Sequence, residues 1–321
     1  MNEPLVEIKN LKTWYPIKRG VFARTVGHVK AVDDITINIE KGETIGLVGE
    51  SGCGKTTFGR TIIGLEKAAS GSVLFKGKDL TTMNSADRKK CSQNIQMIFQ
   101  DPFSSLNPRL TIMDIITEGL IEHNKIEKSI EADATRLLEE VGLNHEALYR
   151  YPHEFSGGQR QRIGVARAIG LKPDLIICDE SVSALDVSVQ AQVINLLMDL
   201  RDKYQLSYLF ISHDLSVVRQ ISTKIAVMYL GKIVEFGPTK QIIENPQHPY
   251  TKALISAVPV PGKTIKDRVV LKGEIPSASN PPPGCRFHTR CPIATDNCKQ
   301  EIPELENKGN TQVACFNTDN D

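Results

Sequence analysis

The segment Gly49–Thr57, which reads Gly-Glu-Ser-Gly-Cys-Gly-Lys-Thr-Thr, constrains the fold of this chain more than any other. The apolar stretch before it, Thr44–Val48, predicts a buried strand, and Phe58–Leu65 after it predicts a helix. Glycines where a strand turns into a helix let successive backbone N–H groups converge on an anion, and the helix N-terminus adds partial positive charge there. The spacing G-x-x-x-x-G-K-[ST] in this setting predicts a loop that holds the phosphates of a nucleotide.

Residues of this loop have distinct expected roles. The Lys55 ammonium is expected to reach the β- and γ-phosphates, and the Thr56 hydroxyl is expected to bind Mg²⁺. The alternative is a glycine-rich turn that fits the pattern by coincidence, and the strand and helix on either side argue against it. The residues expected to contact the nucleotide in this stretch are Gly49, Ser51, Gly52, Gly54, Lys55, Thr56 and Thr57.

Composition narrows the class of protein. The 321-residue length suits one large domain with an appendage. Lys and Arg number 39 against 38 Asp and Glu, which gives neither the basic surface of a nucleic-acid-binding protein nor a strong field toward a membrane. No uninterrupted apolar run approaches the roughly 18 residues of a membrane span, and the N-terminal sequence has no signal-peptide pattern. We therefore expect a cytoplasmic protein that docks on another chain if it serves a membrane process.

The order of patterns along the chain predicts an α/β fold with an insertion. Leu5–Leu11 and Ala31–Glu40 alternate like strands, and the basic, glycine-containing stretch 18–30 between them is expected to be a flexible excursion. Apolar residues recur at helical spacing over about 105–170, which predicts an inserted helical subdomain. We expect a first domain over 1–238 and a small, proline-rich C-terminal domain over 239–321.

Two carboxylates follow a predicted core strand. The apolar run Leu175–Cys178 ends in Asp179 and Glu180, and ligands of open α/β sheets bind at the C-terminal ends of strands. Asp179 is expected to hold Mg²⁺ through water, and Glu180 to polarise the water that attacks the γ-phosphate. An exposed acidic turn is the alternative, which the phosphate loop earlier in the chain disfavours.

A second anion-binding element lies far along the sequence. Ser156, Gly157, Gly158 and Gln159 place small residues and backbone N–H groups ahead of a predicted helix. One chain then has two phosphate-binding elements. We expect two such domains to pair head to tail, each presenting Ser156 and its glycines to the nucleotide on the other's loop.

Together these motifs resemble those of the ATP-binding-cassette (ABC) ATPases. The resemblance implies a P-loop NTPase core, namely a RecA-like mixed sheet with an antiparallel β subdomain, that hydrolyses ATP with Mg²⁺. It implies that Ser156–Gln159 reach the γ-phosphate across a dimer and that Asp186 lies in the dimer-communication loop. It also implies that Gln100 contacts Mg²⁺ and the transport partner, and that His213 contacts the γ-phosphate. The expected catalytic residues are thus Glu180, His213 and Gln100.

The resemblance leaves the adenine contact open between two aromatic residues. In the family an aromatic side chain before the phosphate loop stacks on adenine. Tyr15 matches that position best, and Trp14 is the other choice.

The C-terminal part narrows the resemblance to oligopeptide and dipeptide importers. Glu244–Leu254 is similar to the stretch that follows the core in that group, and Pro16–Gly20 is similar to the F-type ATPase subunit. The resemblance implies a second, unlike ATPase subunit, two transmembrane permease subunits and an extracytoplasmic solute-binding protein. It places the chain on the cytoplasmic face of the plasma membrane, with a peptide as solute, and nickel or a sugar as alternatives.

Four cysteines crowd the C-terminus. Their spacing, C-x5-C-x6-C-x16-C, differs from the C-x2-C pairs of zinc ribbons, and thiolate-only sets with irregular spacing fit an iron–sulfur cluster. The resemblance implies a four-iron cluster on Cys285, Cys291, Cys298 and Cys315. Zinc, unligated thiols and disulfides stay open as alternatives.

Other classes of cassette ATPase fit less well. Cassettes that act on DNA interrupt their two halves with coiled coils or zinc modules, whereas an ordinary helical segment joins the halves here. Translation-factor cassettes carry two phosphate loops, and this chain has one. A non-catalytic regulatory cassette would not need Lys55, Asp179, Glu180 and His213 all in place. We therefore expect a transport ATPase with no nucleic-acid partner.

Overall fold

The computed structural model describes residues 3–258, 271 and 273–318. Met1 and Asn2, the start of the N-terminal sequence in which no signal peptide is expected, lie outside the described residues. Contacts divide the chain into two units. The first comprises the described parts of Met1–Ile39, Thr44–Thr81 and Ser212–Asp321, and the second comprises Glu40–Glu43 and Thr82–Ile211.

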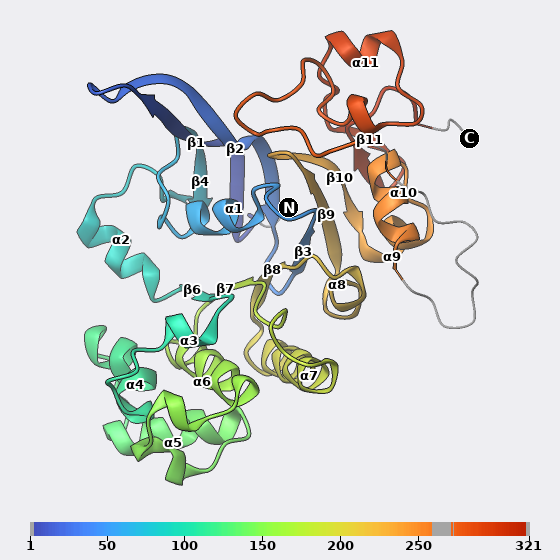
Figure 1. Ribbon diagram of the computed structural model, residues 1–321. Helices are drawn as coiled ribbons and strands as arrows, with labels where there is room; N and C mark the ends of the chain where they lie inside the picture. The colour runs from blue at the N-terminus through green and yellow to red at the C-terminus, as the bar shows by residue number, and fades with distance from the viewer. Residues whose placement is uncertain (1–2, 259–270, 272, 319–321) are drawn as a thin grey trace. The chain divides into compact units, whose positions relative to one another are not determined.

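An antiparallel sheet in the first unit contains a long N-terminal hairpin. Its strands are β1 (Val6–Arg19), β2 (Arg24–Ile39), β4 (Ser70–Phe75) and β5 (Lys78–Asp79), in the order β2-β1-β4-β5 (Figure 1). The pairing of β1 with β2 extends from Val6 opposite Ile39 to Arg19 opposite Arg24.

The expectation of a flexible excursion over residues 18–30 is therefore wrong. Most of that stretch forms ladder hydrogen bonds, and the turn is closed by the Ala23 N–H, which donates to the Gly20 carbonyl at 3.0 Å. Gly20 has a φ of 75°, which a residue without Cβ adopts at no steric cost.

The first unit also contains the strand that precedes the phosphate loop. The strands are β3 (Thr44–Val48), β9 (Lys224–Tyr229), β10 (Lys232–Pro238), β11 (Glu306–Lys308) and β12 (Thr311–Val313), in the order β11-β12-β10-β9-β3. β3 is buried throughout and pairs with β9 in parallel. The helices of this unit are α1 (Lys55–Ile62), α8 (Leu215–Ile221), α9 (Thr239–Glu244), α10 (Pro249–Ser256), η4 (His288–Arg290) and α11 (Asp296–Gln300).

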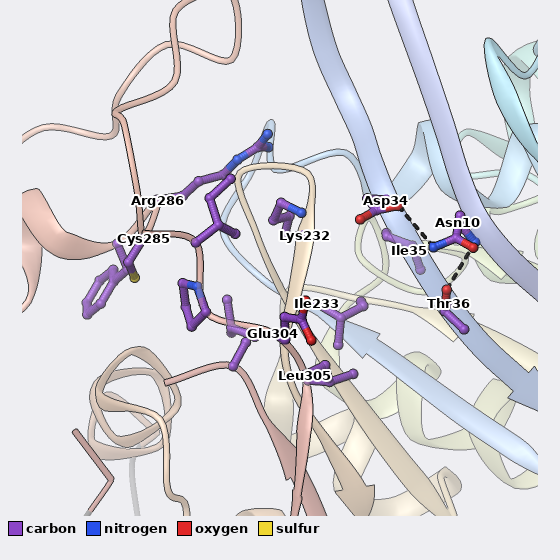
Figure 2. Close-up of a pocket in the computed structure, with 15 residues that line it drawn as sticks. Asn10, Asp34, Ile35, Thr36, Lys232, Ile233, Cys285, Arg286, Glu304 and Leu305 are labelled. Atoms are coloured by element: carbon purple, nitrogen blue, oxygen red, sulfur yellow. Dashed lines mark hydrogen bonds between the residues drawn. The ribbon is translucent and has the colours of Figure 1, made fainter. Parts of the chain in front are cut away.

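A cavity of about 500 Å³ lies in the first unit between strands and C-terminal residues (Figure 2). Asn10, Asp34 and Lys232 line it from β1, β2 and β10, and Arg286 and Glu304 from the C-terminal region. The Asn10 side chain donates to Asp34 at 3.2 Å, which ties β1 to β2 where both residues have positive φ.

The second unit combines three parallel strands with a helical insertion. The strands are β6 (Ile95–Ile98), β7 (Leu175–Asp179) and β8 (Ser207–Ile211), in the order β8-β7-β6. The helices are α2 (Ser85–Ser92), α3 (Pro102–Ser105), α4 (Ile112–Glu122), α5 (Ile130–Glu140), η1 (His145–Tyr149), η2 (Pro152–Glu154), α6 (Gly157–Gly170) and α7 (Val187–Tyr204). α4, α5 and α6 gather together in Figure 1 and bury their apolar faces, and they lie within the range 105–170 where the sequence predicts helices. Across the described ranges, no helix combines the length and apolar character that a membrane span needs.

Candidate nucleotide-binding site

The phosphate loop in the first unit folds around its own lysine. Lys55 is 4% exposed, and its ammonium donates to the Gly49 carbonyl at 2.8 Å and to the Glu50 carbonyl at 3.2 Å. Gly54 is the N-cap of α1, and no described side chain caps this helix start. The first turn of α1 also lacks an acidic residue. The helix start therefore keeps its partial positive charge for an anion, as the sequence predicts.

Two glycines of the loop are required by close backbone approaches. A Cβ on Gly54 would lie 1.9 Å from the Ala31 carbonyl oxygen, and one on Gly49 would lie 2.2 Å from that of Met228. Gly54 has a φ of 109°, which L side chains rarely adopt. The loop thus rests on backbone of β2 and β9, and its path depends on the absence of side chains.

The two aromatic candidates for adenine stacking differ in their surroundings. Trp14 donates its indole N–H to Asp33 at 3.1 Å and lies 5.0 Å below the Lys30 ammonium. Tyr15 is 36% exposed, and its hydroxyl interacts with the side chain of Thr57 in the first turn of α1. Tyr15 therefore lies against the first turn of α1, and the stacking of either aromatic residue on adenine stays a prediction.

His213 belongs to the first unit as well. It is exposed and follows Ser212, whose N–H donates to the Leu47 carbonyl of β3 at 3.1 Å. That hydrogen bond places His213 beside the C-terminal half of the strand that leads into the phosphate loop.

The predicted carboxylates and glutamine meet in the second unit. Asp179 is buried at the end of β7, and Glu180 follows it with a φ of 45°. A positive φ is uncommon for a residue with a side chain and is often retained at functional sites. The Gln100 side-chain amide donates to the Glu180 carboxylate at 2.9 Å, although 80 residues separate them. The structure therefore brings together two of the three expected catalytic residues.

Ser156 and Gln159 form a reciprocal cap on α6. The Gln159 N–H donates to the Ser156 hydroxyl at 3.3 Å, and the Ser156 N–H donates to the Gln159 side chain at 3.0 Å. Ser156 and Gln159 are exposed, and Gly157 packs against Leu185. A Cβ on Gly158 would lie 2.3 Å from the Val189 side chain of α7, so this glycine also serves close helix packing.

Asp186 caps helix α7. Its carboxylate accepts from the Val189 N–H at 3.0 Å and from the Ser188 hydroxyl at 2.8 Å. These hydrogen bonds, with the Val189 N–H first, lower the pKa of Asp186. The residue expected in a communication loop therefore has a structural role in this chain.

The four C-terminal cysteines do not form the expected metal site. Among the described residues, no group of three or more His, Cys, Asp or Glu is placed to hold a metal ion, and every cysteine is free. Burial raises the pKa of Cys285 to about 11 and also raises the pKa values of Cys291 and Cys315, and neighbouring cysteines of the set add to each shift. The Cys298 sulfur contacts the Thr295 hydroxyl at 3.3 Å. The iron–sulfur ligand set, and its zinc alternative, are therefore not supported.

Sequence reasoning missed the contacts between the phosphate loop and the C-terminal region. The Glu50 carboxylate accepts two hydrogen bonds from Arg290, and the Glu50 N–H donates to the Tyr250 hydroxyl. Arg290 lies directly before Cys291, in a stretch where the sequence predicts a role only for the cysteines. The one signal in the sequence was Glu50, a charged residue that closely follows the apolar stretch Thr44–Val48.

Two family models match the chain. The model described as "ABC transporter" matches residues 32–183, and the model described as "Oligopeptide/dipeptide transporter, C-terminal region" matches residues 234–298. Among curated proteins, the oligopeptide transport ATP-binding protein AppF of Bacillus subtilis is 54% identical over 98% of this chain and 97% of its own length. The oligopeptide transport ATP-binding protein OppF of Salmonella typhimurium is 52% identical over 98% of this chain and 96% of its own length. The dipeptide transport ATP-binding protein DppF of Escherichia coli is 47% identical over 100% of this chain and 96% of its own length.

Solved structures agree on the fold. A dimeric, post-hydrolysis structure of the ATP-binding cassette MJ0796 bound to ADP and Pi aligns with a TM-score of 0.64 at 24% identity, over 73% of this chain and 98% of that one. With near-complete matches at about half identity to the curated relatives, the chain belongs to the family of ATPase subunits of oligopeptide and dipeptide ABC transporters.

Proposed function

We propose that the chain binds MgATP through its phosphate loop and that the resulting hydrolysis drives peptide import. The observation that carries this proposal is the loop itself, where Lys55 is buried against an uncapped helix start without acidic residues in its first turn. A helix start of this kind favours an anion at its N-terminus. The interaction of Tyr15 with Thr57 supports Tyr15 as the residue that stacks on the adenine.

The residues proposed to hold Mg²⁺ suit that ion. Thr56 and Gln100 offer a hydroxyl and an amide oxygen, and the Asp179 carboxylate is proposed to act through water. Oxygen atoms are the ligands that Mg²⁺ prefers. When bound, the ion neutralises charge on the β- and γ-phosphates. Lys55 adds a second positive charge at the same phosphates.

Water activation is assigned to Glu180. Its carboxylate is oriented by the Gln100 amide at 2.9 Å, and its backbone is fixed by the N–H that donates to the Ile211 carbonyl at 3.0 Å. A carboxylate held this way can polarise a water for in-line attack without a covalent step, because phosphoryl transfer needs positioning and charge neutralisation. His213 is proposed to contact the γ-phosphate.

The second half of each site is proposed to come from a partner. Ser156 and Gln159 are exposed at the start of α6 and the two glycines between them are half-buried, so an ATP-bound neighbour can reach Ser156. The relatives named above are oligopeptide and dipeptide transport proteins. We assign the same cargo to this chain and expect an unlike ATPase subunit, two permease subunits and an extracytoplasmic binding protein, with this chain on the cytoplasmic face of the membrane and residues 239–321 as a separate C-terminal domain.

Co-purification tests the transport role. The tagged full chain, isolated from detergent-solubilised membranes of its own cells, should bring down two membrane proteins and a second, unlike ATPase in fixed ratio. The Lys55→Ala chain is the matched control, because it should assemble equally well while losing ATP binding. Recovery of nucleic acid and DNA-associated proteins instead would contradict the transport role.

A further inference from the structure

Glu50, the second residue of the phosphate loop, is held by residues from the C-terminal region of the chain. Its backbone N–H donates to the Tyr250 hydroxyl of α10 at 2.9 Å. Its carboxylate accepts two hydrogen bonds from the Arg290 guanidinium, at 2.7 and 3.0 Å. All three residues belong to the first unit, so the loop and its restraints lie in one unit.

The Glu50–Arg290 pair is shielded from solvent. The Arg290 side chain is 7% exposed and the Glu50 side chain 25% exposed. A bidentate guanidinium–carboxylate contact that is partly buried is stronger and more specific in geometry than an exposed ion pair. The hydrogen bond to Glu50 raises the pKa of Arg290, so the guanidinium stays charged in this contact.

Aromatic packing fixes the two residues that hold Glu50. The ring of Tyr250 lies 4.7 Å from that of Tyr229 and 5.4 Å from that of Phe287, and all three side chains are almost fully buried. Phe287 is three residues before Arg290 and meets Tyr229 edge to face at 5.2 Å. Tilted and edge-to-face ring pairs of this kind hold their members in defined orientations. The position of Arg290 is thereby set by the same core that positions Tyr250.

The same C-terminal segment also reaches the far end of the loop. Arg286 donates to the Leu230 carbonyl in the turn between β9 and β10. The next residue in that turn, Gly231, donates its N–H to the Cys53 carbonyl at 2.8 Å. The loop is therefore held at Glu50 directly and at Cys53 through the β9–β10 turn.

We propose that the segment Cys285–Cys291, together with Tyr250, is a latch that holds the phosphate loop in its nucleotide-binding conformation. In this account Arg290 and Tyr250 are positioning residues for ATP binding, and they do not touch the nucleotide. A loop that is already ordered binds phosphate without the entropy cost of ordering its backbone. The latch rests on the proposed binding of ATP by the loop, and it extends control of that step to a region outside the nucleotide-binding motifs.

The test compares Arg290→Met, Glu50→Gln and the double variant in the full chain. Equilibrium binding of MgATP is measured by titration calorimetry, together with amide hydrogen exchange of residues 49–54. Each single variant should weaken binding by about tenfold, as expected for a lost hydrogen bond between charged groups. The double variant should bind no more weakly than either single variant, because both remove one contact. Exchange in the loop should accelerate in all three.

Matched variants separate the latch from general effects. Lys299→Met removes an exposed ion pair with Asp296 in the same C-terminal region and should leave ATP affinity unchanged. Tyr250→Phe keeps the aromatic packing and removes only the hydroxyl, so it should weaken binding severalfold even where Arg290→Met fails to fold. Arg290→Lys should restore part of the affinity.

Two results overturn the latch. One is wild-type ATP affinity in Arg290→Met and in Tyr250→Phe, and the other is a double variant whose loss is the sum of the two single losses. Lys55→Ala distinguishes this failure from failure of the proposed function. If Lys55→Ala loses ATP while the latch variants keep it, only the latch is wrong. If Lys55→Ala binds ATP normally, the loop is not the nucleotide site.

Discussion

Replacing Asp33 with Asn should destabilise the fold severely, because it leaves a buried charge without its partner. The Asp33 carboxylate on β2 pairs with Arg286, and the two side chains are 11% and 6% exposed. Arg286 extends from the C-terminal segment to the β9–β10 hairpin (Figure 2), where it also donates to the Leu230 carbonyl. In the Asp33→Asn variant the guanidinium keeps its hydrogen bond to the Leu230 carbonyl and loses the negative charge that Asp33 supplies.

The size of the effect follows from the balance of burial and attraction. Burial lowers the pKa of Arg286 more than Asp33 raises it, so the intact pair offsets only part of the cost of burying the charge. Removing one member of a buried pair typically costs about 3–5 kcal/mol, whereas replacing both by apolar groups is often nearly neutral. Asp33→Asn should therefore lose about 3–5 kcal/mol of unfolding free energy, and Asp33→Asn combined with Arg286→Met should lose less.

Urea denaturation, followed by fluorescence of Trp14, measures this directly. Trp14 is the only tryptophan and donates to Asp33 at 3.1 Å, so it reports on this region. Asp296→Asn, which removes an exposed partner of Lys299, is the matched control and should leave the midpoint in place. An Asp33→Asn chain within about 1 kcal/mol of the wild type, or a double variant less stable than it, would refute the reasoning.

Two further predictions concern the C-terminal helix and the loop. His248 accepts the Tyr250 N–H at 3.1 Å, and burial lowers its pKa from 6.5 to about 3. The contribution of neutral His248 to the free energy of unfolding is therefore intact above pH 6.5 and is lost as pH falls toward 3. Between pH 7 and 5 the unfolding free energy of the wild type, measured by urea denaturation, should fall by on the order of 2 kcal/mol more than that of His248→Asn. Equal losses in the two chains would contradict the assignment. Gly54→Ala, whose Cβ would lie 1.9 Å from the Ala31 carbonyl oxygen, should abolish ATP binding. Gly42→Ala, also at a positive φ but with no described atom within 4 Å of its Cβ, should bind ATP normally.

The parts of the fold that sequence reasoning anticipated are governed by local pattern. The strand β3, the phosphate loop and α1 follow one another within 19 residues, and each is set by burial or by glycine. Helices α4 to α6 likewise follow from apolar spacing. Within the site, the apolar run before Asp179 predicts a strand that ends there, and β7 does end at Asp179 with Glu180 next. Residues at the end of a parallel strand lie at one edge of the sheet.

The features that sequence reasoning missed depend on contacts between residues that are not neighbours in the sequence. Polar residues and Gly20 make the stretch 18–30 look like a loop, and only its pairing with β1 makes it a strand. Glu50 and Arg290 are 240 residues apart, and no local pattern links them. The cysteine spacing suggested a metal site, whereas the distances among those side chains depend on how the C-terminal loops pack.

The most direct test of the account separates ATP binding from hydrolysis at Glu180. Glu180→Gln keeps the size of the side chain and the contact with Gln100, so the variant should bind MgATP with wild-type affinity. Its ATP turnover, measured as phosphate release in the assembled transporter, should fall by at least about a hundredfold, because the amide polarises water poorly. Multiple turnover at the wild-type rate in this variant would contradict the central claim.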